Sequence, residues 1–300
     1  TTSNCVPARE ERSRGARAIA ARRGRPNRGL LAINHEYTDG EYLHPNGASA
    51  VNGVRPAEEV AKESASHGVS IVEIREIDPG VWEMVKGRYN RRINAASPMQ
   101  LSGPVRGSDL VKTLYSPDGT MTRGTVNNCA SGPTPWGTYL TCEENWAGYH
   151  VNTDASRPRE HTRYGLSSTQ SDYLWESVEE RFDATRKAAD ASGDYRNAPN
   201  TFGWVVEIDP FDPASTPKKR TALGRFGHEG AWFAPAVPGR PLTVYMGDDA
   251  RNEYFYKFVT KGVYLPSPQR VDADILDSGT LYVARFNDDG SGEWLPLDIG

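Results

Sequence analysis

Three apolar segments of the chain, each expected to be a β-strand, end in acidic side chains. The acidic ends are Glu36, Glu143 and Asp249, and they lie about 106 residues apart in both intervals. A strand with Val-Glu-Ile, followed by Asp-Pro, comes after each of the first two, at 72–79 and 206–210. Such a repeat favours a β-propeller, whose antiparallel sheets surround an axis and whose innermost strands end at one central channel. The alternative is a β-sandwich, in which the acidic ends face solvent separately.

The composition agrees with an all-β fold of short strands and many turns, because the chain is rich in Gly, Tyr and Trp. The formal net charge of -4 argues against a general nucleic-acid binder. No apolar run approaches the roughly 20 residues that a membrane span needs. The cysteines are Cys5, Cys129 and Cys142, and their odd number excludes a fully paired set of disulfides within the chain. A Cys129–Cys142 bridge remains one interpretation of Cys142.

The strand expected over 137–141 ends in a thiol, two carboxylates and an amide, in the order Cys142-Glu143-Glu144-Asn145. Adjacent carboxylates repel each other, and they hold a neighbouring thiol in its protonated form. A hard cation removes this repulsion, and a transition metal also accepts the thiolate. Three other strand ends are polar as well: Asn34-His35-Glu36, His228-Glu229 and Asp248-Asp249. We therefore predict a metal cluster where these ends meet, with His35 and His228 packing beside the ligands.

The chain divides into an atypical start and one large folded domain. Residues 1–28 contain eight arginines, and we expect a poorly ordered end there, with a basic arm for phosphate or anionic lipid as the alternative. Residues 29–300 form the folded part. Within it, Leu174, Val178 and Phe182 follow helical spacing, so we predict a helical insertion over 172–191.

Several longer strings of the chain resemble one known family. They are Asn34-His35-Glu36-Tyr37, Cys142-Glu143-Glu144-Asn145, Gly227-His228-Glu229-Gly230 and Gly247-Asp248-Asp249-Ala250-Arg251-Asn252. These strings are similar to those of the PhoX alkaline phosphatases. The resemblance implies a β-propeller, six-bladed in the complete family fold and only partly contained in this chain. It also implies a cluster of ferric iron (Fe3+) and calcium (Ca2+), with a cysteine thiolate among the iron ligands.

The resemblance assigns roles to individual residues. Cys142 is the expected iron ligand and Glu229 a bridging or iron-binding carboxylate. Glu36, Glu143 and Asp248 are the expected calcium-binding or bridging carboxylates, with Glu144 and Asp249 in reserve. Arg251 follows the Asp pair and offers a planar fork for a phosphate oxyanion; the alternative is a salt bridge to Asp248 or Glu253.

The implied activity is the hydrolysis of phosphate monoesters to inorganic phosphate, in the service of phosphate acquisition. The implied location is the periplasm or the exterior, after export in the folded state through the twin-arginine route, and we expect a monomer when complete. The family's Arg-Pro-Glu and later Pro-Asp-Gly motifs do not follow Leu297, so we expect the chain to be roughly the middle of a larger protein. The alternatives are a non-catalytic calcium-stabilised propeller module and a calcium-dependent phosphodiesterase or lactonase.

Overall fold

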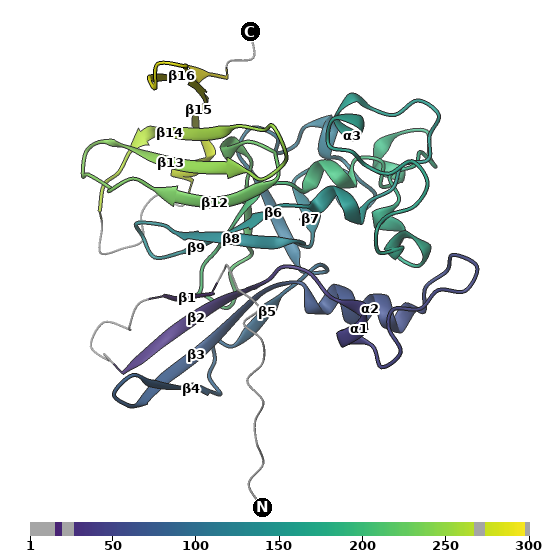
Figure 1. Ribbon diagram of the computed structural model, residues 1–300, viewed down its shortest axis with the longest axis horizontal. Coiled ribbons are helices and arrows are strands. Elements are labelled where there is room, and N and C mark those ends of the chain that lie inside the picture. The colour runs from purple at the N-terminus through teal and green to yellow at the C-terminus, as the bar shows by residue number, and fades with distance from the viewer. Residues whose placement is uncertain (1–15, 20–26, 267–273, 298–300) are drawn as a thin grey trace, which may run out of the picture.

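The computed structural model describes residues 16–19, 27–266 and 274–297. It contains three β-sheets, and Figure 1 shows the second sheet between the third, above it, and the first, below it. Most of the helices and long loops gather on one side of these sheets. The all-β fold class predicted from the sequence is therefore confirmed.

The first sheet has the strand order β1-β2-β3-β4, and β5 also pairs with β3. Its strands are β1 (Ala16–Ile19), β2 (Arg28–His35), β3 (Gly68–Asp78), β4 (Val81–Val85) and β5 (Arg91–Ile93). Alternate side chains of β2 and of the first half of β3 are buried, as expected for strands with one face in a core. Strand β1 falls in the segment predicted to be poorly ordered, so that prediction is wrong for its four residues. The rest of that segment up to residue 26 lies outside the described residues.

The second sheet has the order β7-β6-β11-β10-β9-β8. Its strands are β6 (Pro98–Ser102), β7 (Met121–Arg123), β8 (Asn128–Pro133), β9 (Tyr139–Glu143), β10 (Val205–Ile208) and β11 (Lys218–Arg220). The pairing of β6 with β11 is parallel, and the other pairs are antiparallel. All five residues of β9 are buried, because sheets cover both of its faces.

The third sheet is a meander in which sequential strands pair antiparallel. Its strands are β12 (His228–Phe233), β13 (Pro241–Asp248), β14 (Phe255–Val263), β15 (Gly279–Phe286) and β16 (Gly292–Pro296). Such a four- to five-stranded antiparallel sheet is the unit from which propellers are built.

The α-helices are short, and α2 is the longest of those described. They are α1 (Gly40–Leu43), α2 (Ala57–Ser66) and α3 (Arg159–Arg163). The 3-10 helices among the described residues are η1 (Asp109–Val111), η2 (Trp146–Tyr149), η3 (Trp175–Ser177), η4 (Glu180–Phe182), η5 (Ala191–Gly193), η6 (Ala198–Thr201), η7 (Thr221–Leu223) and η8 (Ile275–Asp277). Pro56 precedes α2, and three of its side chains are buried: Val60, Glu63 and Ser64.

The helix predicted over 172–191 is wrong. Leu174 has a φ of 55°, a left-handed conformation that an α-helix interior does not accommodate. The segment instead makes two separate 3-10 turns, η3 and η4, whose Trp175 and Phe182 pack edge to face with their ring centroids 5.0 Å apart. Both side chains are fully buried in one aromatic cluster. Of the three residues with helical spacing, only Phe182 belongs to this cluster, and Val178 is exposed, so the spacing does not mark one buried face.

Two apolar cores separate the three sheets. Between the first and second sheets, Ala32 and Ile71 belong to the same buried cluster as Tyr139 and Val206. Between the second and third sheets, the cluster is larger and includes Leu140, Cys142, Val205, Ala231, Val244 and Phe258. The neighbouring residues 139 and 140 thus point to opposite sheets, as the twofold period of a strand requires.

Candidate metal centre

Five acidic or thiol side chains from separate segments converge on one place. The donor atoms of Glu36, Cys129 and Glu144 all lie within 4.8 Å of one another, and so do those of Glu144, Glu229 and Asp249. Glu144 belongs to both groups, so we treat the five residues together and call them the acidic cluster. They come from the ends of β2, β9 and β13 and from β8 and β12, and hence from all three sheets. The convergence of strand ends that the sequence predicted is thus present.

The amide of Asn34 fixes the end of β2 against the second sheet. Its Nδ2 donates to the carbonyl oxygens of Cys129, at 2.9 Å, and Ala130, at 3.1 Å. Its Oδ1 accepts from the hydroxyls of Tyr139 and Thr141, both at 2.8 Å. All four hydrogen-bonding positions of this buried amide are therefore used. Glu36 follows two residues later, and the amide consequently holds it beside the thiol of Cys129.

A close approach of β8 to β12 places Cys129 beside Glu229. A Cβ added at Gly132 would lie 1.8 Å from the carbonyl oxygen of Ala231, so only glycine allows this contact. The register of each strand also shifts at a bulge, in β8 between Asn128 and Ser131 and in β12 between Glu229 and Ala231. Bulges re-aim side chains locally. The result is a distance of 3.5 Å between the Cys129 Sγ and a carboxylate oxygen of Glu229.

The electrostatics of the acidic cluster fit a bound cation. Burial, together with the nearby carboxylates of Asp249 and Glu36, raises the pKa of Glu144 to about 7. Burial and the surrounding carboxylates also raise the pKa of the Cys129 thiol well above its ordinary value. The Oε2 atom of Glu144 is buried without a hydrogen-bond donor from the described residues. A cation would satisfy this oxygen and offset the repulsion, and one thiol with four carboxylates is a suitable donor set.

The raised pKa of Glu144 predicts how the stability of the metal-free chain depends on pH. The unfolded chain releases this proton near the ordinary pKa of 4.5, whereas the folded chain keeps it until about pH 7. The folded state therefore binds more protons in this interval, and its stability should fall as the pH rises from 4.5 to 7. Urea unfolding of the chelator-treated chain at several pH values measures the effect.

Glu144→Gln is the matched control for this measurement, because the variant cannot titrate at that position. The difference in unfolding free energy between the wild type and the variant should shrink or reverse as the pH rises to 7. A difference that favours the wild type increasingly over this interval would contradict the raised pKa.

The structure places Cys129, and not the predicted Cys142, in the acidic cluster. Cys142 is not in the acidic cluster, because it follows Leu140 on the face of β9 that packs against the third sheet. It is fully buried, and burial raises the pKa of its thiol to about 12. Both Cys129 and Cys142 are free thiols, so the disulfide interpretation is also wrong.

Glu143 is also outside the acidic cluster, because its carboxylate is engaged elsewhere. One oxygen accepts from Lys219 Nζ at 2.7 Å, and the other accepts from the backbone amides of Gly203, at 3.0 Å, and Trp204, at 3.1 Å. Both members of the Glu143–Lys219 pair are fully buried. The structure thus places Glu143 away from the cluster, whereas Glu144, the neighbouring candidate, lies in it.

Asp248 lies outside both groups of the cluster as well. Its carboxylate accepts from the backbone amide of Ala250 at 3.1 Å, and burial followed by the charge of Glu253 raises its pKa. Asp249, the other reserve residue, is the member of the Asp pair that joins the cluster. Adjacent residues at a strand end diverge, so only one of the two carboxylates can point to the axis.

Arg251 is exposed in the turn that follows β13. No salt bridge joins it to Asp248 or Glu253 among the described residues, because Glu253 pairs with Arg163 Nη2 at 2.6 Å. The Arg251 guanidinium is thus not paired with either of the carboxylates considered in the sequence analysis.

The two histidines lie outside the cluster. His35 Nε2 contacts Ser70 Oγ at 2.8 Å, and His228 Nε2 contacts the Gly224 carbonyl oxygen at 2.8 Å.

A third group of possible metal ligands is already neutralised within the chain. It consists of His44, Glu59 and Glu63. The guanidinium of Arg55 forms ion pairs with both glutamates, at 3.1 Å to Glu59 Oε2, and the indole of Trp175 donates to Glu63 Oε2 at 2.7 Å. This group therefore stabilises the base of α2 and needs no cation.

Comparison with known proteins identifies the family. The family model of the alkaline phosphatase PhoX matches residues 9–300. The chain belongs to the PhoX family. The match begins within the arginine-rich start, so the family resemblance extends into that segment.

Among solved structures, Pseudomonas fluorescens PhoX in complex with vanadate, a transition state analogue, is similar to this PhoX-family chain. The two are 43% identical and superpose with a TM-score of 0.84. The match covers 94% of this chain and 48% of that one, so the chain spans about half the length of the solved PhoX. The three sheets accordingly belong to a β-propeller. A search of curated proteins gave no match. No helix among the described residues is long and apolar enough to cross a membrane.

Proposed function

We propose that the protein is a phosphomonoesterase of the alkaline phosphatase type, which releases inorganic phosphate from phosphate monoesters. The observation that carries this proposal is the convergence of one thiol and four carboxylates in a member of the PhoX family. The similarity to a PhoX bound to vanadate supports it, because vanadate imitates the phosphoryl group in the transition state of its transfer.

We further propose ferric iron and calcium as the bound ions. The group of Glu36, Cys129 and Glu144 includes a thiol and suits iron, whereas the group of Glu144, Glu229 and Asp249 offers only oxygen and suits calcium. Glu144 would bridge the two ions. When bound, such ions polarise the phosphoryl oxygens and offset the negative charge of the transferring group.

The chain's own residues position these ions and the substrate. Asn34 holds Glu36 in place, and the close contact of Gly132 with Ala231 holds Cys129 beside Glu229. Arg251 follows Asp249 by two residues, so its guanidinium is available to orient a phosphate oxyanion at the edge of the cluster. Positioning of this kind accounts for much of the catalysis of phosphoryl transfer.

Elemental analysis and a chelator test the proposed activity. The purified chain should contain iron and calcium and should release p-nitrophenol from p-nitrophenyl phosphate, and the chelator should abolish this activity. Calcium without iron or turnover would instead indicate a non-catalytic module. Turnover of diesters or lactones without turnover of monoesters would indicate a calcium-dependent phosphodiesterase or lactonase.

Replacement of Arg251 by alanine should lower kcat/KM for p-nitrophenyl phosphate by about 10-fold, since a charge-assisted hydrogen bond to the phosphoryl group is lost. Metal content should not change. Arg251→Lys should restore part of the rate, because it keeps the charge but loses the fork. Arg240→Ala is the control, since Arg240 is also exposed and lies at the opposite end of β13 from Asp249. Equal rates for both alanine variants would contradict the role of Arg251.

We also propose that the complete protein acts in the periplasm or outside the cell, as a monomer exported in the folded state. The family resemblance is the support for this part. Folding before export would allow the acidic cluster to be loaded with metal inside the cell. Fractionation of cells that express the complete protein, with the activity assayed in each fraction, tests the location.

A further inference from the structure

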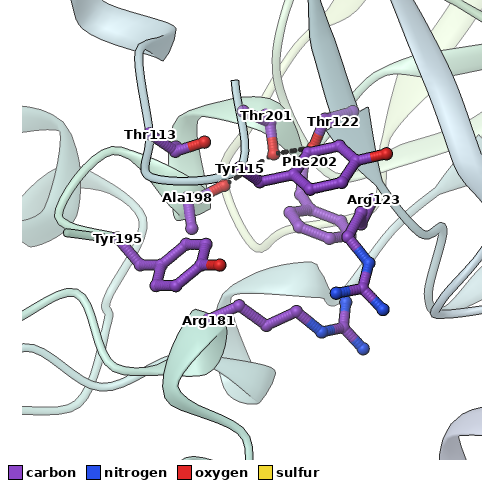
Figure 2. A pocket seen from close by; sticks show the side chains of 9 residues that line it. All are labelled: Thr113, Tyr115, Thr122, Arg123, Arg181, Tyr195, Ala198, Thr201 and Phe202. Atoms are coloured by element: carbon purple, nitrogen blue, oxygen red, sulfur yellow. Dashed lines mark hydrogen bonds between the residues drawn. The ribbon is translucent and has the colours of Figure 1, made fainter. Parts of the chain in front are cut away.

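A pocket with two arginines in its lining lies between β7 and the 3-10 helices η4 and η6, and none of its lining residues belongs to the acidic cluster. Its volume is about 290 Å³, including the part that opens to solvent. Figure 2 shows two arginines, Arg123 and Arg181, on its lower wall and two tyrosines, Tyr115 and Tyr195, across from them. Two positive charges in a small pocket favour the binding of an anion.

Arg181 carries a buried donor that the fold does not use. Its side chain is 7% exposed. The Nε atom donates to Glu179 Oε2 at 2.7 Å, and the Nη1 atom donates to the Ala95 carbonyl oxygen at 2.6 Å. The Nη2 atom is buried without a hydrogen-bond acceptor in the described part of the chain. A buried donor of this kind is costly, so the site is built for an acceptor that the chain does not supply.

The charge around this donor is positive. Burial lowers the pKa of Arg181, and the charge of Arg123 lowers it further. Arg123 lies with its guanidinium carbon 5.5 Å from the centre of the Tyr115 ring, and no described carboxylate forms an ion pair with it. Glu179 therefore neutralises one of the two guanidinium groups, and the other remains without a counter-charge.

The neighbouring hydroxyls complete the recognition site. The hydroxyl of Tyr195 points into the pocket in Figure 2, and no hydrogen bond to it occurs among the described residues. Thr122 donates to Thr201 at 2.7 Å, and Thr201 donates to the carbonyl oxygen of Ala198 at 2.8 Å, so these two hydroxyls are already occupied as donors. The available donors are thus Arg123, Arg181 and Tyr195, which come from three separate segments.

We propose that this pocket binds a tetrahedral oxyanion, such as phosphate or sulfate. Donors that approach from different segments suit an anion whose acceptor oxygens point in four directions better than a planar carboxylate. The guanidinium of Arg181 is nearly removed from water, and a hydrogen bond from it to the anion is therefore strong. The site does not depend on the proposed phosphatase activity, because it shares no residue with the acidic cluster.

Calorimetric titration of the metal-loaded chain with inorganic phosphate tests the proposal. Arg123→Gln should weaken one binding event by at least 10-fold relative to the wild type, whatever binds at the acidic cluster. Tyr195→Phe removes a single oxygen and should weaken the same event by several-fold without disturbing the fold. Arg240→Gln, an exposed arginine elsewhere, should bind phosphate as the wild type does.

Parallel titrations with sulfate and acetate define the chemistry. Sulfate should bind to the wild type and lose affinity in Arg123→Gln, and acetate should not compete with it. Identical phosphate titrations for the wild type, Arg123→Gln and Tyr195→Phe would overturn the proposal, and so would a site that prefers acetate to both tetrahedral anions. If the wild-type chain binds phosphate in this pocket but shows no phosphatase activity, the proposed function is contradicted and the anion site is not.

Discussion

Replacing Cys129 by alanine should remove most of the iron that we propose the protein binds, while replacing Cys142 by alanine should leave that iron in place. The thiol of Cys129 lies within 4.8 Å of the donor atoms of Glu36 and Glu144, whereas Cys142 packs in the core between two sheets. Loss of a group that merely orients a metal ligand typically lowers metal affinity or activity by about 10- to 100-fold, and loss of a ligand itself should cost at least as much. Iron content by elemental analysis and the rate of p-nitrophenyl phosphate hydrolysis measure the two effects together.

The two cysteine variants control for each other. Both remove one buried thiol, so a general effect of lost burial should appear in both. Cys142→Ala should cost about 1 kcal/mol of unfolding free energy, the usual size of a core truncation of this kind, with metal content unchanged. Iron lost from Cys142→Ala but retained in Cys129→Ala would refute the assignment.

Replacing Lys219 by methionine should destabilise the fold by about 3–5 kcal/mol, because the carboxylate of Glu143 would then remain charged and buried without its partner. Lys219 is fully buried, and its ammonium also lies 3.9 Å from the centre of the Phe202 ring. Methionine preserves most of the volume of the side chain, so the loss of charge is the main change. Urea unfolding followed by fluorescence measures the loss.

The preceding residue supplies the control for this prediction. Lys218 pairs with the exposed Asp274 at 2.8 Å, and a surface pair of this kind contributes about 0–1 kcal/mol. Lys218→Met should therefore change stability little. Combining Lys219→Met with Glu143→Gln should recover part of the lost stability, since neither side chain is then charged. Equal effects of the two single lysine changes would show that the buried pair has no special role.

Sequence patterns predicted several of the strands and the meeting of polar strand ends. Glu36 was expected at the end of an apolar strand, and Glu229 was expected from the polar pair His228-Glu229 and the family resemblance; both lie in the acidic cluster. What the pattern could not decide was which of two adjacent residues points inward. The choice between Glu143 and Glu144, and between Asp248 and Asp249, depends on the exact register at a strand end, and a bulge in a neighbouring strand can change it.

Cys129 was missed for a related reason. It lies in β8, within a long segment rich in small and polar residues that gives no clear strand period. Its position became evident only from the contact of β8 with β12, which depends on Gly132. The helix predicted over 172–191 was wrong for a different reason. Leu174, Val178 and Phe182 have helical spacing, but Leu174 has a left-handed backbone and Val178 is exposed, so the spacing does not correspond to a buried helix face.

The parallel pairing of β6 with β11 has a consequence for how the chain folds. On one side, β6 pairs with β7, but on the other it needs a strand that is synthesised more than 100 residues later. Closing so long a loop is entropically costly and slows folding. The emerging polypeptide must therefore keep a bare strand edge until Arg220 has left the ribosome, and chaperones that shield such edges should engage it during this interval.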